Sequence, residues 1–120
     1  MIYVSTDYVF DGKDPPHKVD DEPNPLNAYG KTKLEGEKAL EGQHPDGIIL
    51  RVPILYGPVE YLDESAVTCL LKLLQKQDEK TVSDYEIRYP SHVNDIAKII
   101  RDLAQAKFKV GTNVGLHLIR

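Results

Sequence analysis

Residues 24–35 read Asn-Pro-Leu-Asn-Ala-Tyr-Gly-Lys-Thr-Lys-Leu-Glu, and this stretch decides the predicted fold. Asn24 is a residue type that caps helix N-termini, and Pro25 suits the first helical position. The residues that follow are helix formers without a further proline. The stretch therefore predicts a helix that begins at Pro25 and ends at about Gln43.

Two residues of this helix have chemical potential. Tyr29 and Lys33 are four residues apart and so lie on one helix face. A lone phenol, with a pKa of about 10, exchanges protons poorly at neutral pH. A nearby ammonium favours the phenolate, so such a pair can exchange a proton with an alcohol or a carbonyl. The same spacing also occurs where a surface tyrosine simply packs on a lysine stem.

A short apolar run precedes the helix. Ile2-Tyr3-Val4 fits a buried strand, and two hydroxyl residues, Ser5 and Thr6, follow it directly. In parallel α/β sheets, ligand chemistry gathers outside the carboxyl ends of the strands. Successive side chains of a strand point to opposite faces, so only one of the two hydroxyls can face a site there.

A second apolar run follows the helix. Residues 48–52 read Ile-Ile-Leu-Arg-Val, and Pro53 ends the ladder of this strand. Residues 11–25, with four prolines, predict a loop. We expect residues 1–5 and 48–52 to be adjacent parallel strands with the helix crossing between them. The predicted fold class is α/β, a partial Rossmann-like parallel sheet with flanking helices.

The remaining sequence predicts a turn, two helices and an extended stretch. Residues 55–58 read Leu-Tyr-Gly-Pro and predict a turn, and residues 81–89 predict a short extended stretch. A helix from Asp63 or Glu64 to Leu74 would carry an apolar stripe formed by Val67, Leu70, Leu71 and Leu74. A last helix, capped by Ser91 or Asn94, would bury Ile96, Ile99, Ile100 and Leu103.

The composition narrows the function classes. The chain has 120 residues, a net charge of -4 and a pI near 5.5, so it lacks the basic surface that nucleic acids or anionic membranes attract. Its single cysteine, Cys69, cannot form an internal disulfide, which favours a reducing compartment and a cytosolic or nuclear location. No apolar run approaches the roughly 18 residues of a membrane span. The histidines lack metal-ligand spacing, so no metal site is expected.

Four motifs resemble those of the extended short-chain dehydrogenase/reductases. They read Ser-Thr-Asp-Tyr-Val-Phe-Asp-Gly (5–12), Pro-Leu-Asn-Ala-Tyr-Gly-Lys-Thr-Lys-Leu-Glu-Gly-Glu (25–37), Leu-Arg-Val-Pro-Ile-Leu-Tyr-Gly (50–57) and Tyr-Pro-Ser-His-Val-Asn-Asp-Ile-Ala (89–97). The branch they resemble contains dTDP-4-dehydrorhamnose reductase and the regulatory β subunit of methionine adenosyltransferase. The resemblance covers residues 1–107 as the C-terminal part of an NAD(P)-binding domain, and residues 108–120 are expected to form a divergent tail.

The resemblance implies roles for particular residues. Thr6 would polarise a carbonyl, Tyr29 would donate a proton, and Lys33 would assist Tyr29 and hold ribose hydroxyls. The implied cofactor is NADP, contacted by Tyr29, Lys33 and Leu55. The G-x-G-x-x-G turn that binds the pyrophosphate in such folds does not occur in this sequence. We therefore expect an incomplete NADP site and a fragment or truncated isoform.

The sequence is compatible with three functional classes. The first is a regulatory, non-catalytic subunit of methionine adenosyltransferase, which would bind the catalytic subunit and influence S-adenosylmethionine synthesis in one-carbon metabolism. The second is an NADPH-dependent dTDP-4-dehydrorhamnose reductase-type enzyme that uses Thr6, Tyr29 and Lys33. The third is an isoform without function. The motifs at residues 54–68 and 88–93 favour the regulatory subunit by resemblance.

Overall fold

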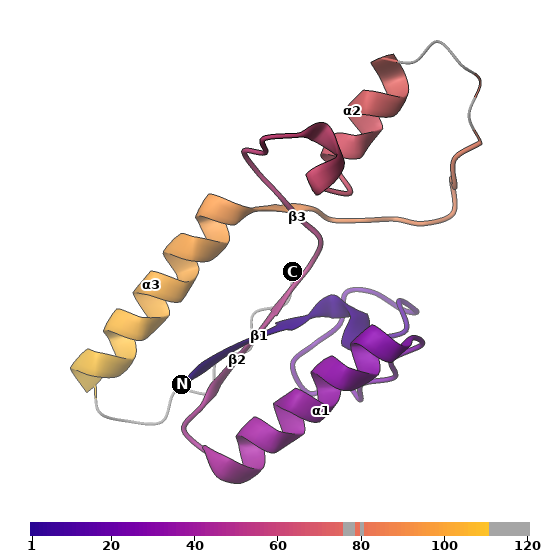
Figure 1. The fold of residues 1–120 in the computed structure, drawn as a ribbon. Coiled ribbons are helices and arrows are strands. Elements are labelled where there is room, and N and C mark those ends of the chain that lie inside the picture. The colour runs from indigo at the N-terminus through magenta and orange to yellow at the C-terminus, as the bar shows by residue number, and fades with distance from the viewer. Residues whose placement is uncertain (76–78, 80, 111–120) are drawn as a thin grey trace. The chain divides into compact units, whose positions relative to one another are not determined.

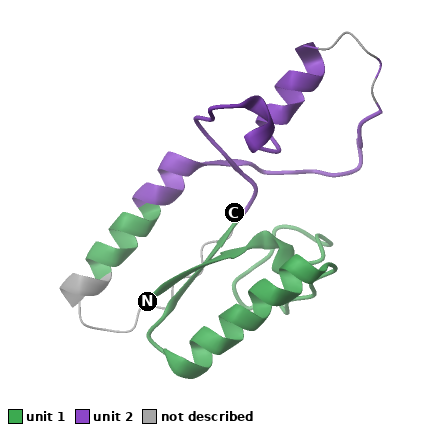
Figure 2. Cartoon of the chain, viewed as in Figure 1, with its two compact units in different colours: residues 1–52, 99–120 green, residues 53–98 purple. Residues whose placement is uncertain are grey.

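The computed structural model describes residues 1–75, 79 and 81–110 (Figure 1). The elements are, in chain order, β1 (Ile2–Thr6), the 3-10 turn η1 (Asp7–Val9), α1 (Ala28–Gln43), β2 (Ile48–Val52), β3 (Leu55–Tyr56), the 3-10 turn η2 (Leu62–Glu64), α2 (Thr68–Gln75), β4 (Ser91–His92) and α3 (Val93–Val110). The described residues form two compact units, residues 1–52 with 99–110, and residues 53–98 (Figure 2). Most of the expected tail, residues 111–120, lies outside the described residues.

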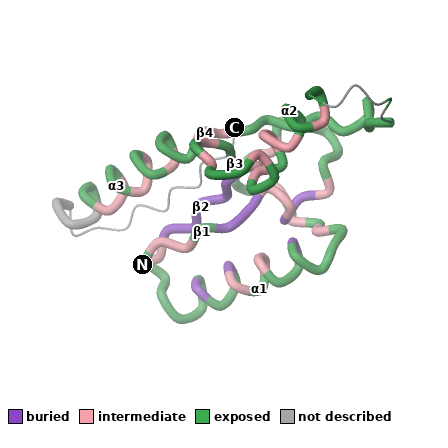
Figure 3. The backbone as a smooth tube through the Cα atoms, turned by 45° about the horizontal axis from the view of Figure 1, so that its top comes forward, coloured by how far each residue is buried: buried purple, intermediate pink, exposed green. Residues whose placement is uncertain are grey.

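The first unit is built on a parallel pair of strands. β1 pairs with β2 in a register that runs from Ile2 opposite Ile48 to Thr6 opposite Val52. All five residues of β2 are buried, as four apolar residues in five predict, and Figure 3 shows this buried strand beside β1. α1 connects the two strands in sequence and contacts β1. The predicted strand–helix–strand unit is confirmed.

The start of α1 differs from the prediction. The helix begins at Ala28 rather than Pro25, and its N-cap is Asn27 rather than Asn24. The Asn27 side-chain oxygen accepts a hydrogen bond from the Gly30 amide at 2.8 Å. The Asn24 side chain instead donates to the Asp11 carboxylate at 3.0 Å and so closes the preceding loop. The predicted end at Gln43 is confirmed.

Gly30 allows α1 to approach η1 closely. A Cβ atom at this position would lie 2.2 Å from the backbone carbonyl oxygen of Tyr8. Gly30 is buried, and the approach brings the first turn of α1 against the residues that follow β1. The glycine therefore fixes the distance between the two parts of the chain that carry Thr6 and Tyr29.

The segment between η1 and α1 forms a loop without helix or strand, as its proline-rich composition predicts. It also folds back on the core, which the composition did not predict. Phe10, 7% exposed, lies flat against the His17 ring, with 4.3 Å between ring centroids and an interplanar angle of 3°. The Asp11 carboxylate accepts hydrogen bonds from the Lys13 amide and the Asn24 side chain. His17, in the middle of the loop, and Asn24, near its end, therefore contact Phe10 and Asp11 at its start.

The second unit contains a short strand where we predicted a turn. β3 pairs with β4 in parallel, Leu55 opposite Ser91 and Tyr56 opposite His92. The prediction of a turn over residues 55–58 was therefore wrong at its first two residues. They pair with Ser91 and His92, which lie too far along the chain for a local pattern to reveal the pairing. Residues 81 to 89, predicted to be extended, form no regular strand in their described part.

The helix predicted from Asp63 or Glu64 to Leu74 is two separate elements. The 3-10 turn η2 ends at Glu64, and Ser65 is extended, with φ -125° and ψ 137°, so a continuous helix is interrupted there. α2 then begins at Thr68. Its apolar stripe includes exposed side chains, since Leu70 and Leu74 are 50% and 81% exposed. Cys69 is half-buried on this helix.

α3 begins close to its predicted start. It starts at Val93, and the imidazole Nδ1 of His92 accepts a hydrogen bond from the Asn94 amide at 3.1 Å. His92, rather than Ser91 or Asn94, thus supplies the first capping contact. The predicted apolar stripe is correctly placed on this helix but is only half-buried; it consists of Ile96, Ile99, Ile100 and Leu103.

Candidate functional site

Tyr29 lies in the first turn of α1 and is 55% exposed. Its ring meets the edge of the Tyr8 ring from η1, with 5.9 Å between centroids and an interplanar angle of 78°. Aromatic pairs favour this edge-to-face geometry. Tyr8 thus positions the Tyr29 ring, a role that sequence reasoning did not assign to it.

Thr6 ends β1, and its side chain is buried. Its hydroxyl accepts a hydrogen bond from the Tyr8 amide at 3.3 Å and donates to the Asp7 carboxylate at 3.2 Å. These bonds cap η1. Thr6 and Tyr29 therefore both contact Tyr8, and the expectation that the Thr6 hydroxyl lies close to the Tyr29 phenol stays a prediction. The neighbouring Ser5 is also buried, and its hydroxyl has no hydrogen-bond partner among the described residues.

Lys33 shares the face of Tyr29 on α1 but directs its ammonium to β1. The Lys33 Nζ atom donates a hydrogen bond to the Val4 carbonyl oxygen at 2.6 Å. It also lies 4.9 Å from the centroid of the Tyr3 ring, within the range of a cation–π interaction. The Tyr3 hydroxyl in turn donates to the Lys33 backbone carbonyl at 3.3 Å. Val4 and Tyr3 are contacts of Lys33 that the sequence did not reveal.

Leu55, the remaining candidate residue, belongs to β3 in the second unit. It is half-buried, and its backbone carbonyl accepts a hydrogen bond from the Ser65 hydroxyl at 3.4 Å. The role of Leu55 beside a nicotinamide ring stays a prediction.

A buried ion pair, which sequence reasoning missed, joins α1 to β2. Arg51 donates from Nε to Glu37 Oε1 at 3.0 Å and from Nη2 to Glu37 Oε2 at 2.7 Å. Both side chains are almost fully buried. An arginine inside the apolar run of residues 48–52 was the available signal, because a buried charge needs a partner.

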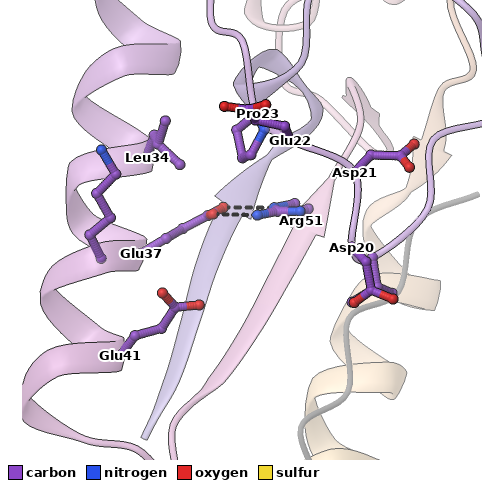
Figure 4. A pocket seen from close by; sticks show the side chains of 10 residues that line it. Asp20, Asp21, Glu22, Pro23, Leu34, Glu37, Glu41 and Arg51 are labelled. Carbon is purple, nitrogen blue, oxygen red and sulfur yellow. Dashed lines mark hydrogen bonds and ion pairs between the residues drawn. The ribbon is translucent and has the colours of Figure 1, made fainter.

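This ion pair borders a hollow of about 610 Å³ in the first unit, shown in Figure 4. Its wall also includes one lysine, four further carboxylates and three apolar side chains, namely Lys38, Asp20, Asp21, Glu22, Glu41, Val19, Pro23 and Leu34. The excess of carboxylates makes it unsuited to an anion such as a phosphate. Among the described residues, no group of three metal-ligating side chains could hold a metal ion. None of the helices described is long and apolar enough to cross a membrane.

Comparison with known proteins places this arrangement in a family. The model of the RmlD substrate-binding domain matches residues 1–119. Methionine adenosyltransferase 2 subunit beta of Bos taurus is 49% identical over 108 residues, which are 89% of this chain and 32% of the relative. A dTDP-4-dehydrorhamnose reductase of Sinorhizobium fredii is 34% identical over 106 residues, 88% of this chain and 35% of the relative. The chain spans about a third of the length of these relatives.

Solved structures agree with the fold. A dTDP-4-dehydrorhamnose reductase from Clostridium acetobutylicum matches with a TM-score of 0.81 and 33% identity, over 98% of this chain and 40% of that one. The Bacillus anthracis enzyme, solved in complex with NADP, matches with a TM-score of 0.80 and 28% identity, over 99% and 40%. The expected resemblance to the extended short-chain dehydrogenase/reductases and the Rossmann-type fold class are confirmed. The chain belongs to the RmlD substrate-binding domain family.

Proposed function

We propose that this chain is part of a regulatory, NADP-binding subunit of methionine adenosyltransferase. It would influence S-adenosylmethionine synthesis by binding the catalytic subunit rather than by chemistry of its own. One observation carries this proposal. The chain is 49% identical to a methionine adenosyltransferase 2 subunit beta and 34% identical to a dTDP-4-dehydrorhamnose reductase, over nearly the same length.

The geometry of the candidate residues supports binding rather than catalysis. The Lys33 ammonium is bonded to the Val4 carbonyl, and the Thr6 hydroxyl is bonded to Asp7 and Tyr8. Two of the three groups that would act in a reduction are thus engaged within the fold. Tyr29 is the exposed member of the set. It is available to contact a ligand, and the Lys33 ammonium keeps N–H donors beyond the one that is bonded to Val4.

The residues present fit one end of NADP. The exposed Tyr29 phenol and the Lys33 ammonium are hydrogen-bond donors that suit ribose hydroxyls. The pyrophosphate of a dinucleotide needs backbone amides at a Gly-rich turn and a helix N-terminus. This sequence has no G-x-G-x-x-G motif. We therefore propose that the chain binds NADP only through its nicotinamide–ribose end.

Association with the catalytic subunit is the decisive test. The full chain is immobilised, and purified methionine adenosyltransferase catalytic subunit is passed over it. The matched control is the corresponding segment of a dTDP-4-dehydrorhamnose reductase, which shares the family but not the named partner. Saturable binding by this chain and none by the control supports the proposal. Equal binding by both, or binding by neither, overturns it.

Titration calorimetry with NADP and NADPH tests the cofactor part. Because a few contacts contribute about 1–3 kcal/mol each and association itself costs several kcal/mol, the expected affinity is weaker than micromolar. Tyr29→Phe should weaken it further, while Tyr61→Phe, which changes an exposed tyrosine of the second unit, should not. A micromolar or tighter dissociation constant for the wild-type chain would contradict the incomplete site.

A reductase is the second candidate, because Thr6, Tyr29 and Lys33 are the residue types that such chemistry needs. NADPH would supply a hydride to the carbonyl carbon of a 4-keto sugar nucleotide, and Tyr29 would supply the proton to its oxygen. The products would be an alcohol and NADP⁺. Oxidation of NADPH that requires dTDP-4-dehydrorhamnose and is lost in Tyr29→Phe would favour this candidate over the regulatory subunit.

A further inference from the structure

Two buried side-chain atoms on β1 and β2 have no hydrogen-bond partner among the described residues, namely Ser5 Oγ and Arg51 Nη1. Ser5 is 1% exposed, and the Arg51 side chain is 6% exposed. Residues of this chain itself cover both atoms, so their burial needs no other segment or partner. Nearly all buried polar groups in folded proteins are bonded, either to protein groups or to ordered water. Each of the two atoms therefore requires a partner.

Ser5 and Arg51 are neighbours on one face of the strand pair. They lie opposite each other in the parallel register of β1 and β2. Neighbouring strands are about 4.8 Å apart, and side chains that lie opposite each other point to the same face. Arg51 bonds Glu37 of α1, so this is the face that α1 covers. Ser5 Oγ and Arg51 Nη1 thus lie in the same layer, between the strands and the helix.

The alternation of side chains along β1 agrees with this placement. Tyr3, two residues before Ser5, bonds the backbone of α1 through its hydroxyl. Residues two apart on a strand share a face, so the Ser5 side chain is also directed to the α1 side.

The two atoms differ in what they can bond. Arg51 Nη1 carries only N–H donors, whereas the Ser5 hydroxyl has one donor and two acceptor positions. A shared partner must therefore accept a hydrogen bond from Arg51 and bond the hydroxyl in either direction. An anion does not suit this place, because the Glu37 carboxylate already neutralises the guanidinium and would repel a second negative charge. The partner is also small, since both atoms are enclosed.

We propose that one ordered water molecule bridges Ser5 Oγ and Arg51 Nη1 beside the Glu37–Arg51 ion pair. Water is small and neutral, and a buried water typically bonds about three polar groups that would otherwise be unsatisfied. Glu37 and Arg51 also border the hollow shown in Figure 4, so solvent lies next to the ion pair. The bridge connects β1 to the ion pair, and β1, β2 and α1 then share one hydrogen-bonded network. This site does not depend on NADP or on the catalytic subunit.

Oxygen-17 magnetic relaxation dispersion of the full chain tests the bound water, because it detects water molecules that stay bound for longer than the protein takes to tumble. Ser5→Ala removes one of the two bonding groups. Ser83→Ala is the matched control, because Ser83 is an exposed serine of the second unit. We expect the dispersion amplitude to fall by the contribution of about one water molecule in Ser5→Ala and to keep the wild-type value in Ser83→Ala. Equal amplitudes in Ser5→Ala and the wild type overturn the proposal.

The stability of Ser5→Ala gives an independent readout. Removal of a hydroxyl that has no partner would relieve a buried unsatisfied group and leave the variant as stable as the wild type or more stable. With the bridging water, the variant loses hydrogen bonds instead, so we expect the equilibrium constant for unfolding to rise about fivefold or more. Urea unfolding followed by circular dichroism measures this constant. A value equal to or below that of the wild type contradicts the bridge.

A crystal structure of the wild-type chain decides the question without a variant, and it replaces both comparisons if Ser5→Ala fails to fold. We expect an ordered water within about 2.7–3.2 Å of both Ser5 Oγ and Arg51 Nη1. The absence of such a water, or a direct hydrogen bond between Ser5 and Arg51, overturns the proposal.

Discussion

Glu37 of α1 and Arg51 of β2 form two parallel hydrogen bonds, at 3.0 and 2.7 Å, inside the first unit. The guanidinium also lies 5.1 Å from the centroid of the Phe10 ring. The pair therefore connects the crossing helix, the second strand and the residue that begins the long loop. Few other polar contacts of the described chain are buried so completely.

Removal of one partner should be costly. Glu37→Gln leaves the Arg51 charge buried without a counter-charge, and we expect the free energy of unfolding to fall by about 3–5 kcal/mol. Urea unfolding followed by circular dichroism measures it. Glu41→Gln is the control, since Glu41 is exposed on the same helix, and should change the value by less than about 0.5 kcal/mol.

The double variant Glu37→Met, Arg51→Met sharpens this test. Replacing both charges with apolar side chains leaves no unpaired ion, so most of the loss in Glu37→Gln should be absent. A double variant as unstable as Glu37→Gln would mean that lost packing, rather than the buried charge, causes the fall in the free energy of unfolding.

Gly30→Ala should destabilise the fold, although alanine is the better helix former. The new Cβ would lie 2.2 Å from the Tyr8 carbonyl oxygen, and the backbone must shift to make room. We expect a loss of at least about 1–3 kcal/mol in the free energy of unfolding. Gly42→Ala, with no atom within 4 Å of its Cβ, should gain about 0.5 kcal/mol. Similar effects at the two glycines would contradict the close approach of α1 to η1.

Asn27→Ala should weaken the start of α1. Loss of the bond from the Gly30 amide to the Asn27 side chain should lower the free energy of unfolding by about 1 kcal/mol. Hydrogen exchange of the Gly30 amide should become faster. Asn24→Ala removes a loop contact to Asp11 instead and should leave Gly30 exchange unchanged. Faster exchange in both variants would show that the loop, and not the cap, controls the helix start.

Acid should loosen the loop at Asp11. The hydrogen bond from the Lys13 amide, and after it that from the Asn24 side chain, lowers the pKa of Asp11 below 3.8. A carboxyl with a lowered pKa stabilises the folded chain above its unfolded pKa, and that contribution is lost as the pH falls through the folded value. An NMR titration should place the Asp11 midpoint below 3.8, and Asn24→Ala should raise it. A wild-type midpoint at or above 3.8 would contradict these contacts.

The sequence was sufficient for the parts of the fold that depend on short-range patterns. The apolar runs that became β1 and β2, and the helix formers between them, predicted the parallel pair and its crossing helix. The position of Tyr29 and Lys33 on that helix followed from their spacing. The hydrogen bond of the Lys33 ammonium could not be predicted from that spacing, because its acceptor is a backbone carbonyl of a strand that is distant in sequence.

The errors share a physical cause. Asn24 and Asn27 are equally good caps by residue type, and the choice between them depends on Asp11, which bonds Asn24. Leu55 extends a strand only because Ser91 pairs with it. The periodicity of α2 identifies residues that share a face, such as Leu70 and Leu74, but cannot tell whether anything covers that face. Each outcome depends on a contact that lies outside the local pattern.

The stacking of His17 on Phe10 gives the loop a spectroscopic signature of its own. A ring that lies flat at 4.3 Å from another places its protons where the aromatic ring current shifts them upfield. The His17 proton resonances should therefore report whether the loop is folded on the core, without any added label.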